Sequence, residues 1–153
     1  MSPGGFWEDE RGFTLPEIII TIVIMGILAG IASTSWFSAV EGRRVDSATN
    51  QLAADLRLAH TQATNRLANH SIVVTGANSS TYQIGRTGGT LATRTLPGGT
   101  EITAATAIVF KSNGEAEVTS GAGSPITVRS SNDTTNDHTI EFNTSTSRIK
   151  IVP

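Results

Sequence analysis

The segment Gly12-Phe-Thr-Leu-Pro-Glu17, followed at residues 18–32 by IIITIVIMGILAGIA, decides how this chain folds. With its flanks the apolar segment covers residues 13–37, about 25 residues, which is enough for a helix to cross a bilayer of about 30 Å. Thr21 interrupts the run, but its hydroxyl can bond back to its own helix. Because apolar residues on all faces are not typical of a surface helix, the sequence predicts a transmembrane or fibre-core helix.

The polar leader MSPGGFWEDERG, residues 1–12, precedes this run. A conventional signal peptide is cut after its apolar segment, whereas the candidate processing site here, Gly12, lies before it. Cleavage after Gly12 would therefore leave the apolar helix in the mature chain. The leader holds three of the chain's 13 acidic residues and one of its 11 basic residues, so the mature chain is formally neutral. Neutral copies can pack together with little repulsion.

Glu17 lies at the border of the apolar run. An ionised carboxylate inside a membrane costs about 2 to 4 kcal/mol in insertion assays. The carboxylate could reach water at the membrane interface, or it could pair with a positively charged group. A new amino terminus at Phe13 of a neighbouring subunit would supply that charge.

Residues 38–70 read as the amphipathic second half of one helix that runs from Phe13 to about Arg66. Apolar residues recur every three or four positions, at Val45, Ala48, Leu52, Leu56, Ala59, Ala63 and Leu67. No strong breaker separates the two halves, since Gly42 costs only about 1 kcal/mol relative to alanine. We expect this stripe to pack on a sheet.

Residues 71–153 predict a β-rich globular domain, because short alternating segments are punctuated by glycine-rich turns. The expected strands are Ser71–Thr75, Thr81–Gly85, Ala107–Lys111, Ala116–Thr119, Ile126–Ser130, Thr139–Asn143 and Arg148–Val152. The expected core comprises Leu52, Leu56, Ile72, Val74, Ile108, Phe110, Val128 and Phe142. The fold class is therefore α+β, with a long helix packed on antiparallel strands.

The sequence offers no catalytic constellation. The chain has no cysteine, and it lacks the P-loop, dinucleotide and G-x-S-x-G motifs. His60, His70 and His138 lack ligand spacing, and the spacing of Asp133 and Asp137 is not that of an EF-hand. We therefore expect neither an enzyme, nor a metal site, nor a cofactor.

The segment Gly12-Phe13-Thr14-Leu15-Pro16-Glu17, with its apolar run, resembles the class III leader and start of type IV pilins and pseudopilins. The resemblance implies that a prepilin peptidase cuts after Gly12 and that Phe13 is N-methylated. It also implies that Glu17 neutralises the Phe13 amine of an adjacent subunit during assembly. Two features depart from the family pattern: the leader is acidic, and no helix-breaking proline lies between Pro16 and Pro97.

A second resemblance covers roughly residues 48–150. The segments QLAADLRLAH at 51–60, FKSNG at 110–114 and ITV at 126–128 resemble the GspH/FimT-type minor pilins and pseudopilins. His60 stands where that family usually has arginine. The resemblance implies a pilin fold and a subunit of a type IV pilus or a type II secretion pseudopilus, at or near the tip. Its implied partners are other subunits, the inner membrane and the assembly platform. The globular domain would lie outside the cytoplasm, in a periplasmic or extracellular fibre once assembled.

Two alternatives remain open at this stage. The protein could be a major pilin that forms the bulk of a fibre, because its neutral, Ser/Thr-rich character permits it. It could also be a minor pilin that binds DNA for natural transformation, with Arg129, Arg148 and Lys150 as candidate contacts. A net charge of −2 and the lack of interleaved aromatic residues favour solvated surface charges instead.

Overall fold

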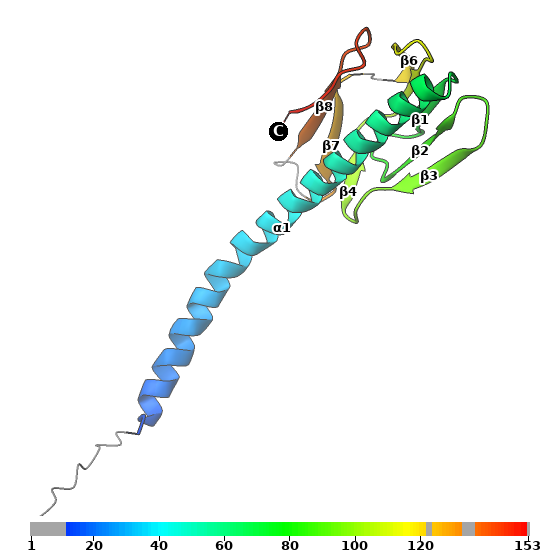
Figure 1. Cartoon of the computed structure of the whole chain (residues 1–153). Coiled ribbons are helices and arrows are strands. Elements are labelled where there is room, and N and C mark those ends of the chain that lie inside the picture. The colour runs from blue at the N-terminus through cyan, green and yellow to red at the C-terminus, as the bar shows by residue number, and fades with distance from the viewer. Residues whose placement is uncertain (1–11, 122–123, 133–136, 153) are drawn as a thin grey trace, which may run out of the picture. The chain divides into compact units, whose positions relative to one another are not determined.

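The computed structural model describes residues 12–121, 124–132 and 137–152, apart from the side chains at 34 and 35. The expected leader, except Gly12, and Asp133 lie outside the described residues. One helix is followed by nine strands in the described part of the chain (Figure 1). The chain divides into two units, residues 1–37 and residues 38–153.

The helix α1 runs over Leu15–Asn65, close to the predicted bounds. Its end resembles a Schellman motif: the Ala68 N–H donates to the Ala63 carbonyl at 3.2 Å, and Leu67 between them has a φ of 48°. Leu67 is 80% exposed, so its assignment to the buried stripe is wrong. Helix α1 ends at Asn65, two residues before Leu67, and the left-handed backbone at Leu67 directs its side chain into solvent.

The first sheet has five strands in the order β3-β2-β1-β5-β6, and every neighbouring pair is antiparallel. Its strands are β1 (His70–Val74), β2 (Thr81–Arg86), β3 (Leu91–Thr95), β5 (Thr106–Phe110) and β6 (Ala116–Gly121). The second sheet has four antiparallel strands in the order β4-β7-β8-β9. Its strands are β4 (Thr100–Ile102), β7 (Ile126–Ser130), β8 (His138–Phe142) and β9 (Ile149–Val152).

The seven predicted strands are all present, with bounds that differ from the predicted ones by at most two residues. Two further strands, β3 and β4, were not predicted from the sequence. The sequence LATRT of β3 is largely exposed and has no apolar alternation, so only its pairing with β2 defines it as a strand. The three residues of β4 pair with β7, more than twenty positions away, which a local pattern cannot reveal.

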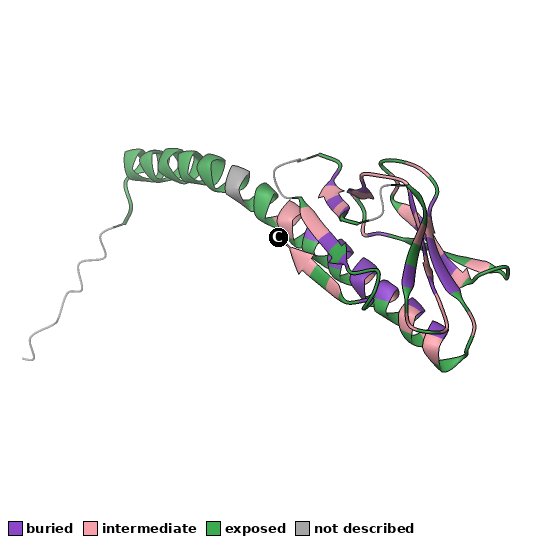
Figure 2. Ribbon diagram, turned by 90° about the horizontal axis from the view of Figure 1, so that it is seen from above, coloured by how far each residue is buried: buried purple, intermediate pink, exposed green. Residues whose placement is uncertain are grey.

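The core joins the buried stripe of α1 to both sheets. Six predicted stripe residues are fully buried: Val45, Ala48, Leu52, Leu56, Ala59 and Ala63. All eight residues predicted for the core are buried as well, and they belong to one cluster with residues of both sheets. Figure 2 shows this buried stripe along the helix within residues 38–153. The prediction of an amphipathic half packed on strands is confirmed.

Polar contacts also tie α1 to each sheet. On the first sheet, the Tyr82 hydroxyl donates to the Asp55 carboxylate at 2.6 Å, and Gln51 donates to the Thr95 carbonyl at 3.0 Å. On the second sheet, the Ser130 hydroxyl donates to the Glu41 carboxylate at 3.0 Å. The helix therefore holds both sheets in one arrangement.

Candidate functional site

The start of α1 places the sequence-predicted processing residues at a helix terminus. The Thr14 carbonyl accepts hydrogen bonds from the N–H groups of Glu17 (3.0 Å) and Ile18 (3.2 Å), and helical residues begin at Leu15. Pro16 occupies the first turn, where its missing N–H costs nothing. Gly12 and Phe13 precede the helix, and Phe13 is 78% exposed. The bond between them thus lies at an exposed, non-helical position.

Glu17 has a local reason for its position as well as a functional one. It lies in the first turn, where a negative charge is favoured by the helix dipole. With Thr14 three residues earlier it forms the Thr-x-x-Glu pattern of a capping box, a helix-start signal that the sequence reasoning missed. Among the described residues, the Glu17 carboxylate has no hydrogen-bond or ion-pair partner. It therefore remains available to a group on another molecule.

The apolar run beyond Glu17 is exposed along its length. Its large side chains are between 46% (Ile18) and 67% (Met25) exposed. Thr21 donates to the Glu17 carbonyl at 2.7 Å, the back-bond predicted for it. Helix α1 is long and apolar enough to cross a membrane, by length and composition. Because leaving this much apolar surface in water is unfavourable, the segment needs a lipid or protein environment.

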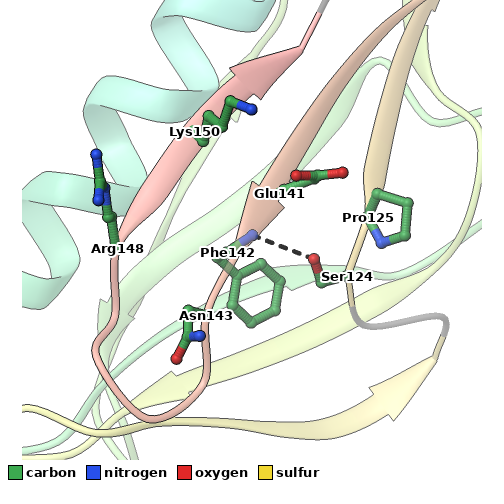
Figure 3. Close-up of a pocket in the computed structure, with 7 residues that line it drawn as sticks. All are labelled: Ser124, Pro125, Glu141, Phe142, Asn143, Arg148 and Lys150. Atoms are coloured by element: carbon green, nitrogen blue, oxygen red, sulfur yellow. Dashed lines mark hydrogen bonds between the residues drawn. The ribbon is translucent and has the colours of Figure 1, made fainter.

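The three basic residues considered for DNA do not gather in one place. Arg129 donates to the Glu101 carboxylate at 2.8 Å and to Asn78 at 3.0 Å, so its charge is paired within the chain. Arg148 and Lys150 instead line an open hollow of about 660 Å³, together with Glu141 on the neighbouring strand. Figure 3 shows these residues with Ser124, Pro125, Phe142 and Asn143, which complete the lining. The hollow carries both signs of charge.

Each of the three histidines contacts another residue of the chain. The His60 ring packs edge-on against Phe110, with ring centroids 5.8 Å apart, and the His70 Nδ1 lies 2.8 Å from the Ala68 carbonyl. His138 Nδ1 lies 3.4 Å from the Asp46 carboxylate. Within the described ranges, no three His, Cys, Asp or Glu side chains are grouped so that they could hold a metal ion.

A helix that is apolar in its first half and packed on antiparallel sheets by its second half is the layout of a pilin-like protein. Two family models match the chain in keeping with this layout. The prokaryotic N-terminal methylation motif matches residues 9–33, and the type II transport protein GspH matches residues 48–146. The chain belongs to the GspH family, whose members are structural rather than catalytic proteins. Both resemblances seen in the sequence are thereby confirmed.

No curated protein and no solved structure shows significant similarity to the chain.

Proposed function

We propose that this chain is a minor pilin or pseudopilin that enters a type IV pilus or a type II secretion pseudopilus through its apolar helix, at or near the tip. A prepilin peptidase removes residues 1–12 and methylates the new amino group of Phe13. The mature chain waits in the inner membrane, with residues 38–153 outside the cytoplasm. The assembly platform and other pilin-like subunits are its partners, and the assembled fibre is periplasmic or extracellular.

The observation that carries this proposal is the unpaired Glu17 carboxylate at the start of an exposed apolar helix. In a bundle of such helices, the positive Phe13 amine of one subunit neutralises Glu17 of its neighbour. Neutralisation removes the cost of holding a lone carboxylate among apolar side chains. Because Glu17 is the single carboxylate of the apolar segment, residues 13–37, this pair can form in one axial position only. The pair therefore also fixes the register of neighbouring helices.

The test compares Glu17→Ala with Glu115→Ala, which removes an exposed carboxylate far along the chain. Both variants are expected to be processed to a chain that starts at Phe13, as intact mass will show. Glu17→Ala should reduce incorporation into fibres and co-purification with other subunits about tenfold or more, whereas Glu115→Ala should match the wild type. Normal incorporation of Glu17→Ala would refute the pairing role.

The quantity of the protein in sheared surface fibres decides between a minor and a major subunit. We expect a processed, scarce species in the fibres and most of the protein in the membrane fraction. A dominant fibre species that starts at N-methylated Phe13 would make the protein a major pilin instead. The DNA-binding alternative gains no support from Arg129, since Glu101 already pairs with it at 2.8 Å.

A further inference from the structure

Strand β9 forms an open edge of the second sheet, where it pairs with β8 alone. The Asn143 N–H donates to the Arg148 carbonyl at 3.0 Å just before the ladder begins. Because hydrogen-bonded pairs alternate along an antiparallel ladder, the pairs that follow are bonded at Lys150 and unbonded at Ile149 and Ile151. The backbone N–H and C=O groups of Ile149 and Ile151 therefore point away from β8.

The other three sheet edges are partly closed by contacts within the described residues. Ser79 exchanges two backbone hydrogen bonds with Ile102 of β4, at 2.9 and 3.1 Å. Gln51 donates to the Thr95 carbonyl of β3, and the Ala116 N–H of β6 donates to the Thr144 carbonyl. No comparable contact joins the outward groups of β9 to another described residue. An open edge of this kind is a template for another strand.

The side chains of β9 indicate which residue types an added strand should have. Ile149 and Ile151 are partly buried against the core, so they present apolar atoms on the inner side of the edge. Arg148 and Lys150 are exposed and form no ion pair among the described residues, although Glu141 lies directly opposite Lys150 in the register. Both cations line the hollow beside the strand (Figure 3). The edge therefore favours a strand with alternating apolar and acidic residues.

A second copy of β9 fits this edge poorly. An antiparallel copy centred on Lys150 would place its own Lys150 directly opposite, and one centred on Ile149 would place Arg148 opposite Lys150. Like charges in directly opposite positions of a sheet are destabilising. The charge on β9 thus disfavours self-pairing in these two registers and favours an acidic partner.

We propose that β9 accepts an extended acidic segment of a different pilin-like subunit, which adds to the second sheet as a fifth strand. The inference rests on the proposed function, because it names a contact between subunits of the same assembly. Backbone hydrogen bonds to Ile149 and Ile151 supply the attachment, and Lys150 with Arg148 selects the acidic side chains.

The probe is a fluorescein-labelled, acetylated and amidated peptide, Thr-Val-Glu-Val-Glu-Val-Thr, titrated into the processed chain in detergent micelles. Fluorescence anisotropy should show saturable binding, and the peptide with lysine in place of glutamate should bind at least tenfold more weakly. Hydrogen exchange of the Ile149 and Ile151 amides in the wild type should slow when the acidic peptide is bound. Equal affinity for both peptides, or unchanged exchange at these two amides, would overturn the proposal.

Two variants separate strand addition from simple charge attraction. Ile151→Pro removes an outward N–H and should weaken peptide binding at least tenfold, whereas Ile151→Val should not. The matched control is Thr93→Pro, a proline at an outward-facing position on the edge of β3, which should leave binding unchanged. Lys150→Glu should reverse the preference between the two peptides. Undiminished peptide binding by folded Ile151→Pro would contradict strand addition. A dimer of the wild-type chain that is lost in Ile151→Pro would contradict the proposed partner, because the added strand would then come from a second copy of this chain.

The two proposals fail in different ways. Peptide binding does not involve Glu17, so a Glu17→Ala variant that enters fibres normally would refute the register role while β9 still bound the peptide. Conversely, a wild-type chain that ignores the peptide but needs Glu17 for assembly would refute only the strand-addition site.

Discussion

At the scale of single residues, Tyr82 connects the first sheet to the helix. Its ring is almost fully buried, and its hydroxyl donates to Asp55 at 2.6 Å and accepts from Gln51 at 3.3 Å. Burial, and after it the hydrogen bond to the Asp55 carboxylate, raises the pKa of Tyr82 well above its usual value. Both effects favour the neutral phenol in the folded chain.

We predict that Tyr82 makes the protein sensitive to alkali. Above a pH of about 10, the unfolded chain loses this phenolic proton while the folded chain keeps it, so the free energy of unfolding falls as the pH rises further. Because Tyr82 is the single tyrosine of the chain, the ultraviolet absorbance of tyrosinate reports it alone. Tyrosinate absorbance should therefore rise together with the loss of the folded circular dichroism signal.

Tyr82→Phe provides the control for that titration. The variant should lose the steep alkaline dependence of the unfolding free energy. At neutral pH it should be less stable by about 1 to 3 kcal/mol, since the mostly buried Asp55 carboxylate loses a donor. An equally steep alkaline loss of stability in Tyr82→Phe would assign the effect to other groups.

At the scale of elements, small residues on one face of α1 let the helix lie close to both sheets. Ala48, Ala53, Ala59 and Ala63 are all fully buried. Alanine at these positions leaves room for the larger side chains of the strands, such as Phe110 and Ile140. The close approach also brings Asp55 within reach of Tyr82.

We predict that Ala59→Leu is destabilising although leucine is a good helix former. The added side chain has to enter a packed core, which typically costs about 1 to 3 kcal/mol. Ala54→Leu is the matched control, because Ala54 is exposed on the same helix and should change stability by less than about 0.5 kcal/mol. Thermal unfolding of both variants checks this, and equal melting temperatures would contradict the close packing.

The end of the β5–β6 ladder that lies away from the connecting turn depends on Gly121, which pairs with Thr106. The register shifts between Ala107 and Ile108, and Gly121 has a φ of 86°. A Cβ atom at Gly121 would collide with the backbone carbonyl of Ala105. Substitution therefore requires the backbone to move.

We predict that Gly121→Ala lowers the unfolding free energy by more than about 2 kcal/mol, from the left-handed backbone and the collision together. Gly88→Ala is the control, because Gly88 has a similar φ of 78° but open space around its Cα atom. Denaturant titration should separate the two variants. Equal losses would mean that backbone conformation alone, and not the Ala105 contact, sets the cost.

At the scale of the whole molecule, the core belongs to the second of the two units. Every residue of the core cluster lies between Ala48 and Phe142, and the large apolar side chains that the structure describes in the first unit are between 46% and 78% exposed. We accordingly propose separate roles for the two units: attachment for the apolar helix start and recognition for the packed domain.

We predict that residues 38–153 fold without residues 1–37. The fragment should be monomeric without detergent and should unfold cooperatively at about the same temperature as the full processed chain in micelles. Circular dichroism and analytical ultracentrifugation test this. Aggregation or a non-cooperative transition would show that the apolar segment contributes to the stability of the domain.

Local periodicity in the sequence was enough to predict the segments whose structure depends on residues close in sequence or on a uniformly apolar environment. The apolar run, the Ala48–Ala63 stripe and the alternating strands follow from repeats of two or three to four residues, which any single segment displays. The candidate processing residues Gly12 and Phe13 and the candidate assembly residue Glu17 form a short local motif beside the apolar run. Their positions in the chain needed no knowledge of the rest of the fold.

Only the tertiary structure decided features that depend on distant partners. β3 and β4 are strands because β2 and β7 lie beside them, and the isolated chain segments carry no signal of it. Likewise, Arg129 forms an ion pair because Glu101 lies directly opposite it on the neighbouring strand β4, whereas Lys150 on the edge strand β9 forms no ion pair among the described residues. The physical reason is that pairing between strands brings together residues far apart in sequence, so charge and edge exposure are properties of the assembled sheet.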